Sequence, residues 1–238
     1  MMRSTLFMLT GLAILTACGT ARSDVAPDRP PIGKLAAVTK DRLCVTKGKL
    51  GDPLESGHPV DVPTMRLVAP GTNGDAASIK FWFRGDTTDK RDLATGGARR
   101  QIGLKLRAEN GCNLVYVMWR LDPKPMLDIS VKRNPGQKSH EECGAGGYTK
   151  IKPDKTKTTP VPALRIGATH ALRAEIKGDT LTAWIDDKIA WQGNLTKEAR
   201  TLVGPAGVRS DNLAFDLVEL LASASDTGPV RCQHVVGD

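Results

Sequence analysis

The chain has 238 residues, 40% of them hydrophobic and 25% charged, and a formal net charge of +8. This composition can bury an ordinary core, and an all-β domain of this length commonly remains single. Aromatic residues are few, while 15 Pro and 24 Gly favour a loop-rich chain of short strands and argue against a helical bundle.

The first twenty residues, MMRSTLFMLTGLAILTACGT, have the pattern of an export signal. Arg3 precedes an apolar run from Leu6 to Leu15 that is too short to anchor stably across a bilayer. The run ends in Leu15-Thr16-Ala17-Cys18, which resembles the lipobox of bacterial lipoproteins. The resemblance implies cleavage before Cys18 and lipidation of that cysteine. An ordinary secretory signal with a chance cysteine is the alternative, and it also implies export.

We therefore expect a signal peptide over residues 1–17, and a lipidated cysteine with a flexible tether over residues 18–40. This predicts an exported protein that is lipid-anchored to the bacterial cell envelope, at the outer membrane in a Gram-negative organism. Without residues 1–17 the chain keeps 33 Lys and Arg against 26 Asp and Glu, a net charge of +7. Such a charge fits anionic polysaccharide or lipid headgroups, and export argues against nucleic acid as a partner.

Four cysteines remain once Cys18 is assigned to the lipobox. An even number in an oxidising compartment predicts two disulfides, for which three connectivities exist. We favour Cys44–Cys232, which would tie the two ends of the domain together, and Cys112–Cys143, which would close a loop of about 30 residues. No C-x-x-C pair occurs and the histidines are far apart, so the spacing does not support a zinc site.

From about residue 41 the hydrophobic pattern is that of β-strands. Residues 78–85, 101–108 and 126–132 alternate between apolar and polar positions, and Asn110-Gly111 predicts a hairpin turn. Residues 112–120 are apolar on both faces, which predicts a central strand. Residues 133–165 are rich in Gly, Pro, Lys and Thr, so we expect a long loop there, where functional residues tend to lie.

The strand pattern resumes in the C-terminal third. Residues 170–193 predict a meander of three short strands with turns at Gly178-Asp179 and Asp186-Asp187. Residues 206–222 predict two more strands, broken at Ser210-Asp211-Asn212. The stretch DLVELLASA could be read as a helix, but the apolar alternation around it favours a strand.

Residues 170–221 resemble the end of a concanavalin A-like domain of the LamG or jelly-roll type. The resemblance is carried by HALRAEIKGDTLTAWIDDKIAWQG and GPAGVRSDNLAFDLVEL, above all by Gly178–Asp186, Gly207–Arg209 and Phe215–Leu220. It implies an all-β, two-sheet antiparallel β-sandwich with ligands on the concave face, and we expect residues 41–238 to form this single domain. The fold hosts lectins, glycoside hydrolases, polysaccharide lyases and adhesive modules, so it does not set the function.

Two kinds of catalysis found in this fold can be compared with the sequence. Jelly-roll glucanases carry their carboxylates as E-x-D-x-(x)-E on one strand, a pattern that is absent here, and Glu141-Glu142 would face opposite sides of a strand. Polysaccharide lyases of the fold use a basic, polar groove, in which a Tyr or His must reach an acidic C–H of the sugar. The chain could furnish such a groove from Arg99, Arg100, Gln101, His140, Tyr148 and Lys150, of which His140, Tyr148 and Arg100 are our catalytic candidates.

Aromatic side chains supply the ligand-binding candidates, because indole faces stack on the C–H surfaces of sugars. They are Trp82 with Arg84 on one strand face, Trp119 at a strand end, and Tyr148. No cofactor is expected. A structural calcium ion fits the resemblance, with the oxygen-bearing side chains of Asp211, Asn212 and Asp216 as candidate ligands.

The sequence therefore predicts a surface-anchored, non-catalytic protein that binds carbohydrate or another envelope or extracellular polymer. Two alternatives stay open: a polysaccharide lyase or glycoside hydrolase that acts on an anionic polysaccharide, and a structural or adhesive module that binds protein. The stretch HEECGAGGY (140–148) is interpreted as a disulfide-stapled loop that holds His140 and Tyr148 at the rim of a groove.

Overall fold

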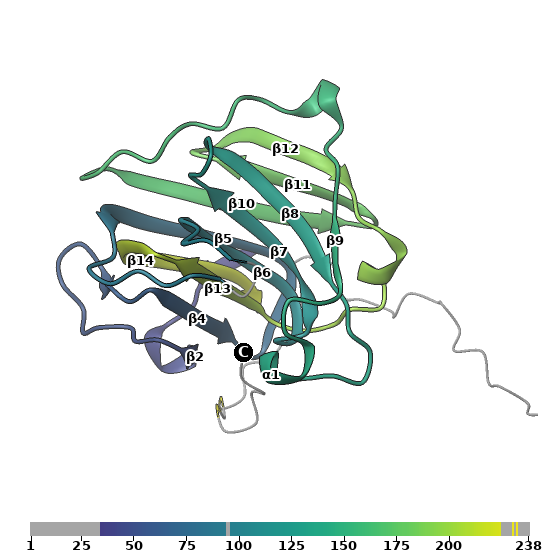
Figure 1. Cartoon of the computed structure of the whole chain (residues 1–238), viewed down its shortest axis with the longest axis horizontal. Coiled ribbons are helices and arrows are strands. Elements are labelled where there is room, and N and C mark those ends of the chain that lie inside the picture. The colour runs from purple at the N-terminus through teal and green to yellow at the C-terminus, as the bar shows by residue number, and fades with distance from the viewer. Residues whose placement is uncertain (1–33, 94–95, 225–229, 231, 233–238) are drawn as a thin grey trace, which may run out of the picture.

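The computed structural model describes residues 34–93, 96–224, 230 and 232. Two seven-stranded antiparallel sheets pack face to face over this part of the chain (Figure 1). Sheet A has the order β1-β14-β5-β10-β11-β12, with β3 also paired to β14: β1 (Leu35–Ala37), β3 (His58–Val60), β5 (Thr72–Asp86), β10 (Thr169–Lys177), β11 (Thr180–Ile185), β12 (Lys188–Asn194) and β14 (Leu213–Ala224).

Sheet B has the order β2-β4-β13-β6-β7-β8-β9. Its strands are β2 (Cys44–Lys47), β4 (Thr64–Ala69), β6 (Gln101–Asn110), β7 (Asn113–Arg120), β8 (Met126–Lys132), β9 (Tyr148–Lys150) and β13 (Ala206–Asp211). The helical segments are short: η1 (Lys40–Arg42), α1 (His140–Cys143), η2 (Lys155–Lys157) and η3 (Lys197–Ala199). No helix in the described ranges has the length and hydropathy needed to span a bilayer. The predicted all-β, two-sheet antiparallel sandwich is confirmed.

The core lies between the sheets and follows the alternation of the strands. In β5, Ile79, Phe81 and Phe83 point inward, while the residues that alternate with them, Lys80, Trp82 and Arg84, are exposed. Phe81 makes edge contacts with Trp119 and Phe215, at centroid distances of 6.3 and 6.0 Å, so aromatic side chains join the two sheets at the centre.

Strand β7 is buried on both faces and lies between β6 and β8, as its doubly apolar sequence predicts. The predicted hairpins form at 178–179 and 186–187, and Asp186 and Asp187 adopt the positive φ that a tight turn requires. The turn before β7 consists of Gly111 and Cys112, one residue later than expected, because Asn110 pairs with Asn113. The stretch DLVELLASA lies in strand β14.

Two predicted boundaries are corrected. The tether was expected to run to residue 40, but Leu35–Ala37 already pairs with β14, so the fold begins before residue 41. The loop expected over residues 133–165 contains α1, η2 and the strand β9, which extends sheet B beyond β8. Residues 1–33, which include the predicted signal peptide and Cys18, lie outside the described residues.

Two disulfides are present, and they join the pairs favoured from the sequence. Cys44–Cys232 links β2 to the C-terminal region, 188 residues away. Cys112–Cys143 links the β6–β7 turn to α1, 31 residues away. The second bridge fixes α1 beside sheet B, where it borders the candidate site.

Candidate functional site

The outward face of sheet B carries a cavity of about 410 Å³. Side chains from most of its strands form the floor, and α1 and the loop between β5 and β6 form walls. Among the described residues that line it, two carboxylates, Asp92 and Asp128, face six cationic side chains: Lys47, Arg66, Arg91, Arg99, Lys150 and Arg209. The cavity is therefore strongly electropositive.

One cross-strand row forms the centre of the floor. Lys47 on β2 lies opposite Arg66 on β4, and Arg66 lies opposite Arg209 on β13. The row continues through Gly103 on β6 to Met118 on β7. A β-carbon at Gly103 would lie 2.1 Å from the carbonyl oxygen of Val117, so only glycine fits at that point of the floor.

A second group on the floor is aromatic. The rings of Tyr116 (β7) and Tyr148 (β9) stack with a centroid distance of 6.1 Å and an interplanar angle of 20°. The guanidinium of Arg209 lies 5.0 Å from the centroid of Tyr116, and the ammonium of Lys132 lies 5.2 Å from that of Tyr148. Cations over the ring faces hold both rings in place, while Tyr148 keeps 38% of its surface exposed.

The wall made by α1 brings His140 to the cavity. Ser139 caps the helix in a capping box with Glu142, and the Cys112–Cys143 bridge ties its last turn to sheet B. Burial lowers the pKa of His140, and the nearby cations Arg66, Lys132, Lys47 and Arg209 lower it further. Both effects favour the neutral imidazole of His140 over its protonated form.

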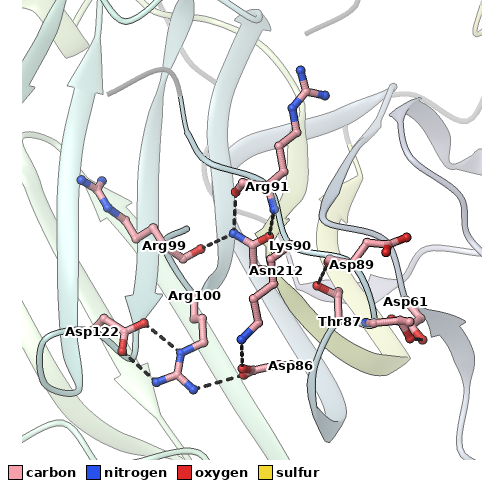
Figure 2. Close-up of polar contacts among 11 residues, drawn as sticks. Asp61, Asp86, Thr87, Asp89, Lys90, Arg91, Arg99, Arg100, Asp122 and Asn212 are labelled. Atoms are coloured by element: carbon pink, nitrogen blue, oxygen red, sulfur yellow. Dashed lines mark hydrogen bonds and ion pairs between the residues drawn. The ribbon is translucent and has the colours of Figure 1, made fainter. Parts of the chain in front are cut away.

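The wall made by the β5–β6 loop depends on Asn212, which is buried at the β13–β14 turn (Figure 2). Its side-chain amide accepts from the Arg91 N–H and donates to the carbonyls of Arg91 and Arg99, at distances of 2.8, 2.8 and 3.1 Å. One side chain therefore joins both ends of the loop. Burial and the neighbouring Arg120 lower the pKa of Arg99, another sign of crowded positive charge.

Several predicted site residues meet in this cavity. His140 and Tyr148 line it, as do Arg99, Gln101 and Lys150 from the set considered for a lyase groove. Arg100 does not line it. Its guanidinium donates to both carboxylate oxygens of Asp122 and to Asp86, on the side of the loop away from Arg91 (Figure 2). Arg100 therefore lies apart from His140 and Tyr148, and its catalytic role stays a prediction.

The tryptophan candidates lie elsewhere. Trp119 is completely buried and donates from its indole N–H to the carbonyl of Pro162, so its expected role as an exposed binding residue is wrong. Trp82 and Arg84 lie on the outward face of β5 in sheet A, and Arg84 pairs with Asp216 at 3.3 Å. The structure therefore does not bring Trp82 together with Tyr148.

The candidate calcium ligands are also separated. Asp211 accepts from Gln101 and Arg209 in sheet B, Asn212 holds the β5–β6 loop, and Asp216 accepts from Ser56 and Arg84 in sheet A. The described residues contain no group of three or more His, Cys, Asp or Glu side chains placed to hold a metal ion. These three residues are structural hydrogen-bond partners of the protein.

Sequence reasoning missed the floor of the cavity, namely Lys47, Arg66, Tyr116, Asp128 and Arg209. A signal was present, since Arg66 lies in TMRLVA and Arg209 in AGVRSD, two short segments in which most of the other residues are small or apolar. A charged residue inside a strand that is otherwise buried on both faces marks either an ion pair or a binding site.

No family model matches this chain, and a search of curated proteins gives no match. Solved structures do match. The carbohydrate binding module CBM66 from Bacillus subtilis has a TM-score of 0.53 at 11% identity, over 76% of this chain and 96% of that chain. The chain has a concanavalin A-like fold.

Two further structures with this architecture are less similar. Domain 4 of AbnA, a GH43 extracellular arabinanase from Geobacillus stearothermophilus in complex with arabinotriose, has a TM-score of 0.45 at 10% identity, over 81% of this chain and 94% of that chain. A tetrameric galectin from the ball sponge Cinachyrella has a TM-score of 0.43 at 13% identity, over 68% of this chain and 99% of that chain.

Proposed function

We propose that this protein binds carbohydrate in the cavity on sheet B, and that a lipid on Cys18 holds it at a bacterial envelope membrane. The observation that carries the binding proposal is the convergence of aromatic, cationic and hydrogen-bonding side chains in one cavity of about 410 Å³. This volume lies in the usual range for small-molecule sites. The shared fold with a carbohydrate binding module supports the same ligand class.

Different side chains of the cavity would contact different parts of a sugar. The exposed part of the Tyr148 side chain offers a surface for the C–H groups of a pyranose ring. Gln101, Ser130 and the lysine and arginine side chains that line the cavity offer hydrogen-bonding groups for hydroxyls. The two walls are fixed by a disulfide and by Asn212, so the site is already formed without ligand, which reduces the entropic cost of binding.

The test is a glycan array of neutral, carboxylated and sulfated oligosaccharides, followed by calorimetry on the hits. Tyr148→Ala should weaken binding at least tenfold, and Tyr148→Phe should retain most of it. Trp82→Ala is the matched control, because Trp82 and Tyr148 are both 38% exposed but lie on different sheets. An array without hits, or binding that depends on Trp82 and not on Tyr148, would overturn the proposal.

A second candidate function is a polysaccharide lyase, favoured by the presence of His140 and Tyr148 beside several arginines in one cavity. In such a reaction a base removes the proton next to the sugar's carboxylate, the electron pair forms a carbon–carbon double bond, and the glycosidic C–O bond breaks as its oxygen takes a proton. The lowered pKa of His140 favours the neutral imidazole, which is the form that a general base must have before it takes a proton. Unsaturated products absorb in the ultraviolet, so a flat absorbance trace across polyuronates would exclude this candidate.

A further inference from the structure

Arg66 is a buried cation, and two of its three guanidinium nitrogens have no hydrogen-bond partner among the described residues. It lies in the middle of β4, is only 5% exposed, and lines the cavity. Its Nε and Nη1 atoms are buried and have no hydrogen-bond partner among the described residues. Buried charges in proteins are nearly always paired, because water that is removed must be replaced by other partners.

Three other buried cations of the described region show the usual behaviour. Arg107 donates to Asp75 and to the carbonyl of Ala199, and Lys132 donates to the carbonyls of Gly111 and Gly144. Arg209 donates to Asp211 at 2.8 Å. Arg66 thus differs from these three side chains, and also from Arg120, which has one unpartnered nitrogen but pairs with Asp128.

The surroundings of Arg66 make its position less favourable still. Lys47 and Arg209 lie directly opposite it on the two adjacent strands, and like charges in such pairs are destabilising. No carboxylate in the described part of the chain forms an ion pair with Arg66. Gln101 and Arg209 both donate to Oδ2 of Asp211, whose Oδ1 has no hydrogen-bond partner among the described residues, and the carboxylate of Asp128 accepts from Arg120 and Lys150.

We propose that the ligand of this cavity carries an acidic group, a carboxylate or a sulfate ester, and that Arg66 receives it. This inference rests on the proposed carbohydrate-binding function and names the class of sugar. A planar guanidinium binds such oxyanions through two parallel hydrogen bonds. The anion would sit among Lys47, Arg66 and Arg209 and cancel their repulsion, with His140 facing it from α1.

Two matched pairs of probes test the inference and separate the two sources of charge. The first pair is a galacturonic acid trimer and its methyl ester, and the second is sulfated maltotriose and maltotriose. We expect one acidic member to bind at least tenfold more tightly than its neutral partner. Which pair shows the preference identifies the group as a carboxylate or a sulfate.

Arg66→Met and Arg66→Lys complete the experiment. Arg66→Met should abolish the preference for the acidic member while the melting temperature stays unchanged or rises, because an unpaired buried charge has been removed. Arg66→Lys, which keeps the charge without the planar fork, should retain part of the preference. A purely structural arginine would instead lower the melting temperature in both variants.

Each failure has a separate meaning. Equal binding of acidic and neutral members, or a preference that survives Arg66→Met, would overturn the assignment of Arg66 and leave carbohydrate binding in place. If Arg66→Met does not fold, Arg66→Lys alone decides. A preference for the acidic glycan that is as strong in Arg66→Lys as in the wild type would contradict binding through the planar guanidinium. Absence of binding by all glycans would overturn the proposed function, and this inference with it.

Discussion

At the scale of single residues, protonation of His140 should make both the stability of the protein and the affinity of the cavity for its ligand depend on pH. Burial and the cations Arg66, Lys132, Lys47 and Arg209 lower its pKa below the ordinary 6.5, with only Glu141 and Glu142 as acidic neighbours on its own helix. The unfolded chain therefore binds this proton more readily than the folded one, so stability is lost as the pH falls below about 6.5.

The same shift has a consequence for binding. An acidic ligand offsets the surrounding positive charge, raises the pKa of His140, and should bind more tightly as the pH falls through that raised value. An NMR titration of the His140 ring with and without the galacturonic acid trimer measures both effects, and His140→Gln identifies the resonance. A ring that titrates above 6.5 in the free protein would contradict this account.

Asp128 provides a second test at this scale. Burial tends to raise its pKa, but Lys150 and Arg120 outweigh burial and hold the pKa below the ordinary 3.8. Asp128→Asn should cost about 1–3 kcal/mol at neutral pH, because two cations lose their counter-charge. The loss should shrink as the pH falls through the lowered pKa, because the wild-type carboxyl group then becomes neutral, like the asparagine of the variant.

Denaturant unfolding at neutral and acidic pH measures this difference. Asp122→Asn is the control, since that carboxylate pairs with Arg100 but its side chain is 41% exposed. Its loss should stay below about 1 kcal/mol, as is usual for exposed ion pairs. Equal losses for the two variants would mean that Asp128 is not a buried charge centre.

The sequence located His140 and Tyr148 near one site but misplaced the tryptophans, for a physical reason. Alternation separates the two faces of a strand, but β7 is apolar on both faces, so nothing local shows that Trp119 points inward while Tyr116 and Met118 point outward. For Trp82, the prediction that the side chain points outward was correct. Which of the two sheets carries the cavity depends on the order of the strands, and local sequence patterns do not contain that order.

At the scale of elements, the Cys112–Cys143 bridge should matter for both stability and binding. Its two cysteines lie 31 residues apart in the sequence. Closing a loop of this length stabilises the fold by an amount on the order of 3 kcal/mol in the chain-entropy model. Because α1 carries His140, a Cys112→Ser/Cys143→Ser protein should also bind the acidic trimer more weakly. The control is Cys44→Ser/Cys232→Ser, which removes a bridge outside the cavity lining and should lose stability while the folded protein keeps its affinity.

The elements also show what sequence patterns can predict. Long strands with alternating or doubly apolar runs, such as β7 and β8, were found with nearly correct bounds. Strand β9 was missed because its three residues are all exposed and lie among Gly, Pro, Lys and Thr. Its place is set by pairing with β8, and a tertiary contact of this kind has no local signature.

At the scale of the whole molecule, the sandwich brings distant segments into one sheet. Strand β13 lies between β4 and β6, so Arg209 reaches Arg66 although more than 140 residues separate them in the sequence. The resemblance of residues 170–221 to concanavalin A-like domains led to the right fold, but the cavity draws most of its residues from before that segment. The fold could thus be predicted, while of the site only one wall and part of the lining could be.

Anchoring is a prediction about the whole molecule as well. If Cys18 is lipidated, the protein should partition into detergent and its mature mass should match a chain that starts at Cys18 with acyl groups attached. Cys18→Ser should release the protein into the soluble fraction or leave it uncleaved. A wild-type protein without attached lipid would contradict the lipobox assignment and leave the binding site unaffected.

The central claim is that sugar binds on sheet B. The most direct measurement is a map of backbone NMR shift changes on titration with the tightest-binding oligosaccharide of the array. We predict that the changes centre on Tyr116, Tyr148, His140 and Arg66. Changes centred on Trp82 and Arg84 in sheet A, or no changes at all, would contradict it.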